Sequence, residues 1–250
     1  MRNIWTIAKR EYDHYFISPV AYVVAVALLF LLGGYFALML MAANPDQSAN
    51  FGGGYIPEIS EINNLFGFLL LLTIPALTMR VLADETRTGT IELLLTAPIR
   101  DFELVAGKWL GSFLFVLTLI LVTVLYPVIL NSQVTPHLDW KLLISSYLAL
   151  ILLSGALIAL GVGISALFSN QVAAFIATFG LFIFLWWLVG IPANLFPAGG
   201  EFFSYMVLNT HFSGTLSQGS VYLSDLIYFI SLMAIGLFTG TVAIEIRRWK

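Results

Sequence analysis

Residues 83–108 read ADETRTGTIELLLTAPIRDFELVAGK, and they form the one long polar interruption in an otherwise strongly apolar chain. Of the 250 residues, 60% are hydrophobic and 10% are charged, whereas a soluble domain carries about 25% charged residues. A water-soluble domain could not bury so much apolar surface, so the sequence predicts an all-α integral membrane protein. The polar stretch is then a loop outside the hydrocarbon core, where it can meet a partner in water.

Six apolar segments are long enough to cross the membrane as helices, because the hydrocarbon core takes about 20 residues. They are residues 19–42, 62–82, 102–130, 141–168, 171–190 and 224–245. Only Ser169 and Asn170 separate the fourth and fifth segments, and the combined length of these two segments requires a hairpin. We therefore expect residues 1–250 to form a single transmembrane domain, without a soluble second domain.

The basic residues indicate the orientation of the six segments. Ten of the eleven Lys and Arg residues fall on the face that carries both termini and loop 83–101: Arg2, Lys9, Arg10, Arg80, Arg87, Arg100, Lys108, Arg247, Arg248 and Lys250. Lys141 lies on the other face. By the positive-inside rule the first face is cytoplasmic. We expect a multi-pass protein of the inner membrane with both termini in the cytoplasm.

Residues 1–18 are predicted to form an amphipathic helix at the membrane interface. One face carries Trp5, Ala8, Tyr12, Tyr15 and Phe16, and the other carries Thr6, Lys9, Arg10 and Asp13. Ser18 and Pro19 then resemble an N-cap followed by proline at the first helical position. The periodicity predicts a packed structural element. The alternative is a basic anchor that only sets the topology.

Two outer loops, residues 44–61 and 191–223, are longer than simple turns. The second contains an apolar stretch, residues 202–208, that is too short to span the membrane. Such a stretch is typical of interfacial or re-entrant segments.

Several kinds of chemistry are excluded by what the sequence lacks. It has no cysteine, no GxxxxGK[ST] phosphate loop and no HExxH motif, and its three histidines are widely separated. The spans hold almost no ionisable residues; Glu61 and Asp225 fall at outer helix ends, where capping or exposure would explain them. We therefore expect no enzyme activity and no cofactor or metal bound by this chain. If the chain transports a substrate, the energy comes from a partner.

The loop itself predicts a short helix between the second and third spans. Gly89 can end one helix, Thr90 can cap the next, and Pro98 ends it. The resulting helix exposes leucines, which favours docking to a protein partner. The alternative is a helix that lies on the lipid headgroups.

The loop resembles the ABC type-2 permeases, the membrane subunits of ABC exporters. The matching pattern is Glu85, Gly89, Thr90, Glu92, Leu94, Leu95, Pro98, Ile99, Asp101, Glu103, Gly107 and Lys108. The N-terminal region adds Arg10, Glu11, Phe16, Ser18, Pro19, Ala21 and Tyr22. The tail, with His211, Phe212, Gly219, Asp225, Tyr228, Phe229, Glu245, Arg247, Arg248 and Trp249, is most similar to the branch of the gliding-motility-associated permease.

This resemblance implies six transmembrane helices, an N-terminal interfacial helix, a cytoplasmic coupling helix at about residues 89–97, and short re-entrant helices before the sixth span. The coupling helix would dock in a groove of a separate ABC ATPase. Leu93 and Leu94 would fill that groove, and Glu85 and Glu92 would pair with basic residues of the ATPase or with Lys9 and Arg10. The residues implied to form the coupling site are Glu85, Gly89, Thr90, Glu92, Leu93, Leu94 and Pro98, and those of the interfacial helix are Trp5, Lys9, Arg10 and Glu11.

The working unit implied by the resemblance contains two ATPase subunits and a second permease, identical or related. ATP and magnesium would bind to the ATPase. We also expect contact with membrane lipid and none with nucleic acid, and the outer loop could bind an accessory protein. The function expected is an exporter permease. The alternative is a membrane scaffold that anchors a soluble or surface machine without transport.

Overall fold

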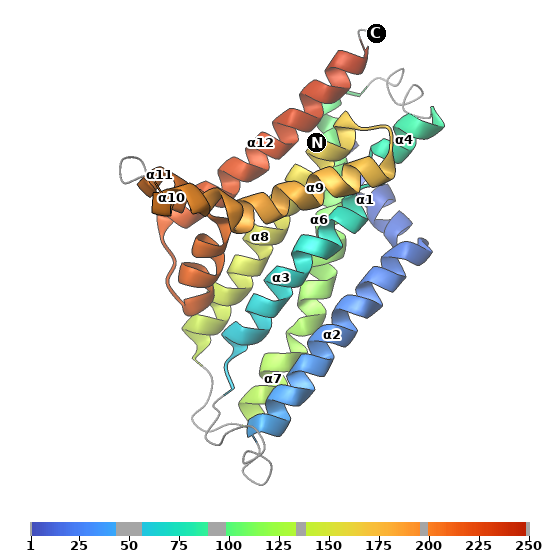
Figure 1. The fold of residues 1–250 in the computed structure, drawn as a ribbon. Coiled ribbons are helices and arrows are strands. Elements are labelled where there is room, and N and C mark those ends of the chain that lie inside the picture. The colour runs from blue at the N-terminus through green and yellow to red at the C-terminus, as the bar shows by residue number, and fades with distance from the viewer. Residues whose placement is uncertain (1, 44–56, 90–98, 134–138, 196–199, 249–250) are drawn as a thin grey trace.

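The computed structural model describes residues 2–43, 57–89, 99–133, 139–195 and 200–248, and in these ranges the regular structure is helical. Figure 1 shows the arrangement of the elements. They are α1 (Arg2–Tyr15), α2 (Pro19–Ala43), α3 (Ile59–Thr78), α4 (Ala83–Thr88), α6 (Asp101–Thr123), α7 (Leu125–Gln133), α8 (Trp140–Leu167), α9 (Gln171–Trp186), η2 (Leu188–Gly190), α10 (Ile191–Leu195), α11 (Gly200–Tyr205), the π-helix η3 (Thr210–Thr215), η4 (Leu216–Gln218) and α12 (Leu223–Arg248).

Five helical stretches among the described residues are long and apolar enough to cross a membrane: Pro19–Ala43, Ile59–Thr88, Asp101–Ser132, Trp140–Leu167 and Leu223–Arg248. They agree with five of the six expected segments. The remaining segment forms α9, an apolar helix of 16 residues that ends where Trp187 leaves the helical conformation at φ −136°. At 1.5 Å per residue α9 is about 24 Å long, less than the roughly 30 Å of the hydrocarbon core. The count of six spans stays a prediction.

The third expected span is not one helix but two. The sequence predicted a single helix over residues 102–130, whereas α6 ends at Thr123 and α7 begins at Leu125. Pro127 has no N–H to donate to the carbonyl of Thr123, so the helical ladder is interrupted there. The free carbonyl of Thr123 instead accepts a hydrogen bond from the Tyr147 hydroxyl of α8, at 2.9 Å.

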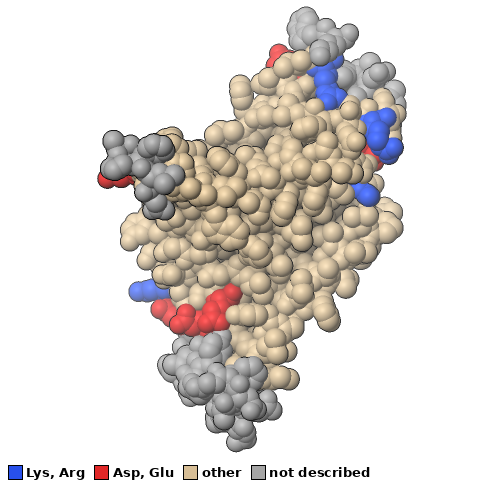
Figure 2. All heavy atoms as spheres, in the orientation of Figure 1, with Lys and Arg blue, Asp and Glu red and all other residues tan. Residues whose placement is uncertain are grey.

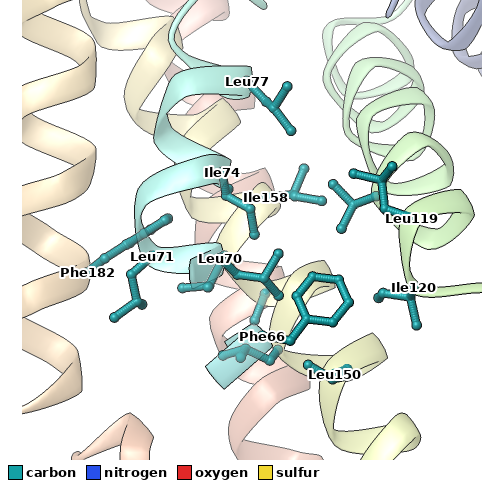
Figure 3. Close-up of a cluster of buried hydrophobic side chains, with 14 of the residues drawn as sticks. Phe66, Leu70, Leu71, Ile74, Leu77, Leu119, Ile120, Leu150, Ile158 and Phe182 are labelled. Carbon is teal, nitrogen blue, oxygen red and sulfur yellow. The ribbon is translucent and has the colours of Figure 1, made fainter. Parts of the chain in front are cut away.

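The core lies between α3, α6, α8 and α9 (Figure 3). It is filled by Phe66, Leu70 and Ile74 of α3, Leu119 and Ile120 of α6, Leu150 and Ile158 of α8, and Phe182 of α9. Helix α12 approaches α8 from another side, and the two backbones touch at Gly163 and Gly236. A Cβ atom at either glycine would overlap the backbone of the opposite helix, so only glycine permits this contact.

The hairpin predicted between the fourth and fifth segments is present. Asn170 caps α9, since its side-chain oxygen accepts from the backbone N–H of Val172 at 2.8 Å. Short helices also precede α12, as expected: α10, α11, η3 and η4 fill the described part of residues 191–223. Their re-entry into the membrane stays a prediction.

Charges are divided between the two ends of the molecule. Figure 1 places α1, α4 and the C-terminal end of α12 toward one end, and α7 with the first turns of α3 and α8 toward the other. Figure 2 shows Lys and Arg gathered at the first end, where acidic side chains also lie, and acidic side chains beside a basic one at the second. This distribution agrees with the expected orientation, which stays a prediction.

Candidate functional site

The polar loop leaves the membrane part of the chain through α4, and the structure describes its two ends. Of the predicted coupling residues, Glu85 and Gly89 are described, whereas Thr90, Glu92, Leu93, Leu94 and Pro98 lie outside the described residues, together with nearly all of the expected coupling helix. Gly89 ends α4 in the left-handed conformation at φ +73°, which favours glycine. The prediction that Gly89 ends a helix is confirmed.

The entrance to the loop is anchored to α8. The Ser165 hydroxyl oxygen accepts hydrogen bonds from the backbone N–H groups of Leu82 (3.2 Å) and Ala83 (3.1 Å), which open α4. A helix starts with N–H groups that lack partners inside the helix, and here a side chain from another helix satisfies two of them. Gly161, one turn earlier on α8, leaves room for Thr78 at the end of α3.

A buried lysine joins three helices beside this entrance. Lys108 of α6 is 2% exposed, and its ammonium donates to Glu85 Oε1 of α4 at 2.8 Å and to Glu11 Oε2 of α1 at 3.2 Å. We call these three side chains the Lys108 clamp. A buried ammonium needs anionic partners to offset its desolvation, and two carboxylates provide them. The clamp therefore connects α1, α4 and α6.

The pairing that we expected for Glu85 within the chain differs from the observed one. Lys9 and Arg10 of α1, which we expected to pair with Glu85, are exposed and have no hydrogen bond or ion pair among the described residues. The side chain of Glu85 instead reaches Lys108 on α6. Glu11 is the side chain of α1 that binds the same ammonium.

Helix α1 is a packed element, as its periodicity predicted, because it lies directly on α6. Added Cβ atoms at Gly107 and Gly111 would meet Ile7 Cβ and the carbonyl oxygen of Ala8, each at 2.7 Å. The two glycines thus let the backbones approach closely, and Ala8 is fully buried between them. Trp5, which we placed on the same face, is instead 58% exposed.

Polar contacts complete the junction between α1 and α6. The hydroxyl groups of Tyr15 and Ser112 are 2.9 Å apart, and those of Tyr12 and Thr118 are 3.1 Å apart. Burial raises the pKa of the Tyr15 phenol above its usual range, so this hydroxyl stays neutral. Apolar packing and neutral hydrogen bonds therefore hold α1 along α6 on either side of Glu11.

The remaining contacts at the loop ends involve α9 and α12. Asp84 accepts from Arg87 at 2.9 Å and from Gln171 of α9 at 2.6 Å. At the other end of the loop, Asp101 of α6 forms an ion pair with Arg248 of α12. Both ends of the loop are therefore tied to the helix bundle, and a displacement of the loop acts on several helices.

A second polar cluster lies before and at the start of α12, and sequence reasoning missed it. Asp225 was expected to cap a helix or face the interface, but it is 2% exposed. Its Oδ1 lies 2.7 Å from His211 Nδ1, and its Oδ2 accepts from the Thr215 hydroxyl at 2.7 Å. The ring of His211 stacks on Tyr228. The cluster joins η3 to α12, and only the presence of His211 and Asp225 in the matched tail signalled it.

With this geometry in place, comparison with known proteins identifies the class. Residues 5–199 match the model of the ABC-2 family transporter proteins, which covers well over half of the chain. The chain belongs to this family. It is therefore a multi-pass membrane protein and a transmembrane permease of an ABC transporter, and the family in general pairs with an ABC ATPase. Among curated proteins no sequence matches the chain.

Proposed function

We propose that this chain is the permease of an ABC exporter and that it is driven through loop 83–101 by a separate ATPase subunit. The observation that carries the proposal is the Lys108 clamp, since one buried ammonium links the base of the loop to α1 and to α6. A push on the loop reaches Glu85 first and, through Lys108, acts on two further helices. If the clamp broke, a buried charge would lose an ionic partner, and this costs free energy. The three helices are therefore expected to move together.

The rest of the working unit follows from the family resemblance. Two ATPase subunits bind ATP and magnesium and carry out the hydrolysis, so that this chain is not itself an enzyme. A second permease, identical or related, completes the pathway across the membrane. Both termini and the loop face the cytoplasm, and the membrane is the inner membrane. The similarity of the tail supports placement in the gliding-motility-associated branch.

ATP can drive such a permease only if the ATPase binds the loop differently in its two states. Two attachments at the entrance of the loop favour this mechanism. Ser165 fixes the entrance to α8, whereas Lys108 fixes α4 to α1 and α6. A change in the loop between these attachments would shift α6 and α1 relative to α8.

The first experiment is purification of the tagged full chain from its native membrane in mild detergent, followed by mass spectrometry of the proteins that accompany it. We expect an ABC ATPase in near-equal amount, with ATP turnover by the purified complex. A well-folded preparation that brings no ATPase would refute the proposal and favour the scaffold function. Recovery of a second permease would establish whether the pair is identical.

A paired comparison then tests the clamp. Lys108→Met should leave ATPase recovery in place, because the docking residues of the loop are unchanged, and should uncouple ATP turnover from transport. The matched control is Lys141→Met, since Lys141 is exposed at the other end of the molecule. Equal coupling in both variants would show that the clamp does not transmit the movement.

A further inference from the structure

We propose that a groove between α1 and the junction of α3 and α4 binds one anionic phospholipid. Its phosphate would lie against Lys9, Arg10 and Arg80, and one acyl chain would lie against α2 and α3. This inference goes beyond the proposed function and does not depend on it, because it concerns a lipid site and not the coupling to an ATPase.

The groove has a volume of about 1140 Å³. Helix α1 and the turn that leads into α2 form one wall, and the end of α3 with α4 forms the other. Lys108 also lines the groove, so the site lies directly beside the clamp. A cavity of this size accommodates the headgroup and the upper part of the acyl chains of a phospholipid.

Three of the four basic side chains that line the groove have no bonded partner among the described residues. Glu11 and Glu85 are paired with Lys108, and Asp84 is bonded to Arg87 and Gln171. The three basic side chains named above form no hydrogen bond or ion pair within the described part of the chain, although Arg80 lies within electrostatic reach of Asp84.

The other titratable groups of the groove also count toward its charge. Asp13 and His14 are both exposed and also lack a bonded partner among the described residues. Four basic and four acidic side chains line the groove, and together with Arg87, which binds Asp84, the group carries five positive and four negative charges. This small positive balance, with three cations that lack a bonded partner among the described residues, favours an anion.

The groove is also apolar where α2 and α3 line it. Val20 and Ala21 of α2 and Ala76 and Leu77 of α3 line it, and both helices belong to predicted spans. At its rim the side chain of Ile17 is 78% exposed. An exposed isoleucine beside unpaired cations suits the level of the headgroups, where apolar and charged groups of a lipid meet. Apolar walls and cations together match a phospholipid better than a small soluble anion.

The test uses the full chain in detergent, titrated with dioleoyl phosphatidylglycerol, dioleoyl phosphatidylcholine or inorganic phosphate, with the bound species counted by native mass spectrometry. Each basic side chain near an anionic headgroup contributes about fivefold in affinity. Because the groove and its ion-pair partners carry a net charge of one, we expect the first phosphatidylglycerol to bind about fivefold more tightly than phosphatidylcholine. The variant with Lys9→Gln, Arg10→Gln and Arg80→Gln should lose this preference. The control, Lys141→Gln, should keep it.

Two further outcomes separate a lipid from a free anion. Ala76→Phe narrows the apolar wall, so it should weaken phosphatidylglycerol binding and leave the binding of inorganic phosphate unchanged. Equal binding of the two lipids by the wild-type chain, or an unchanged preference in the triple variant, would overturn the proposal. Inorganic phosphate that displaces phosphatidylglycerol, together with no effect of Ala76→Phe, would identify a free-anion site and also overturn it. Unfolding temperatures of all variants show whether each is folded.

Discussion

Replacing Lys108 by methionine tests the clamp most directly. Methionine keeps most of the aliphatic stem and removes the ammonium, so the packing of α6 is nearly unchanged. Glu11 and Glu85 then lose the ammonium that both contact, and both are largely buried, with side chains 17% and 26% exposed. Removing one partner of a fully buried ion pair costs about 3–5 kcal/mol. Because both carboxylates keep some contact with solvent, we expect about 2–3 kcal/mol here.

The expected loss can be measured as a change in unfolding temperature. In a chain of this length 1 kcal/mol corresponds to about 2–4 °C. Lys108→Met should therefore lower the midpoint by about 4–12 °C in detergent at a fixed heating rate. Lys141→Met, at the exposed control position, should lie within about 1 °C of the wild type, as surface substitutions usually do.

A second variant separates lost charge pairing from lost packing. Adding Glu11→Gln and Glu85→Gln to Lys108→Met removes the two carboxylates that have lost the Lys108 ammonium, so the triple variant should be more stable than Lys108→Met alone. If Lys108→Met unfolds at the wild-type temperature, or if the triple variant is no more stable than the single one, the clamp does not hold these helices together.

Three further predictions concern other contacts of the loop and of α1. Gly111→Ala should cost about 1–3 kcal/mol in thermal unfolding, because its Cβ would lie 2.7 Å from the Ala8 carbonyl oxygen. Gly34→Ala, with nothing within 4 Å of the added Cβ, should not destabilise the protein. Equal stability of the two variants would contradict the close contact. Ser165→Ala should cost about 1–3 kcal/mol, because the N–H groups of Leu82 and Ala83 lose their acceptor. Hydrogen exchange at these two amides should accelerate. Unchanged exchange would rule out the attachment of the loop entrance to Ser165. Leu94→Asp should weaken ATPase recovery by about 10-fold or more through a charge placed in an apolar contact, and Leu94→Met should preserve it; normal recovery with Leu94→Asp would count against docking through the loop.

The apolar runs predicted the spans because a helix that crosses a membrane must be apolar over most of its length. Helix ends were predictable where local chemistry determines them, as at Pro19, Asn170 and Gly89. The break near Pro127 was visible in the sequence, but the apolar pattern continues through it and favoured a single helix.

Contacts between distant residues were not predictable in the same way. Lys108 lies 97 residues from Glu11 and 23 from Glu85, and no periodicity links them. Its burial depends on how α1 packs against α6, which the sequence pattern of either helix alone does not specify. His211 and Asp225 pair across an irregular segment that contains a π-helix, so helical spacing gave no signal for their contact.

The His211 cluster has a consequence for how this chain can change shape. Both ring nitrogens face oxygen atoms, Asp225 Oδ1 and the carbonyl oxygen of Tyr205, each at 2.7 Å. Separating η3 from α12 would leave the Asp225 carboxylate without His211 and Thr215 in an apolar setting. Ser145 of α8 also donates to the carbonyl of Leu216 in η4, which follows η3 directly. We therefore expect the N-terminal ends of α8 and α12, with η3 and η4 between them, to move as one rigid body, so that a hinge that opens this chain lies outside it.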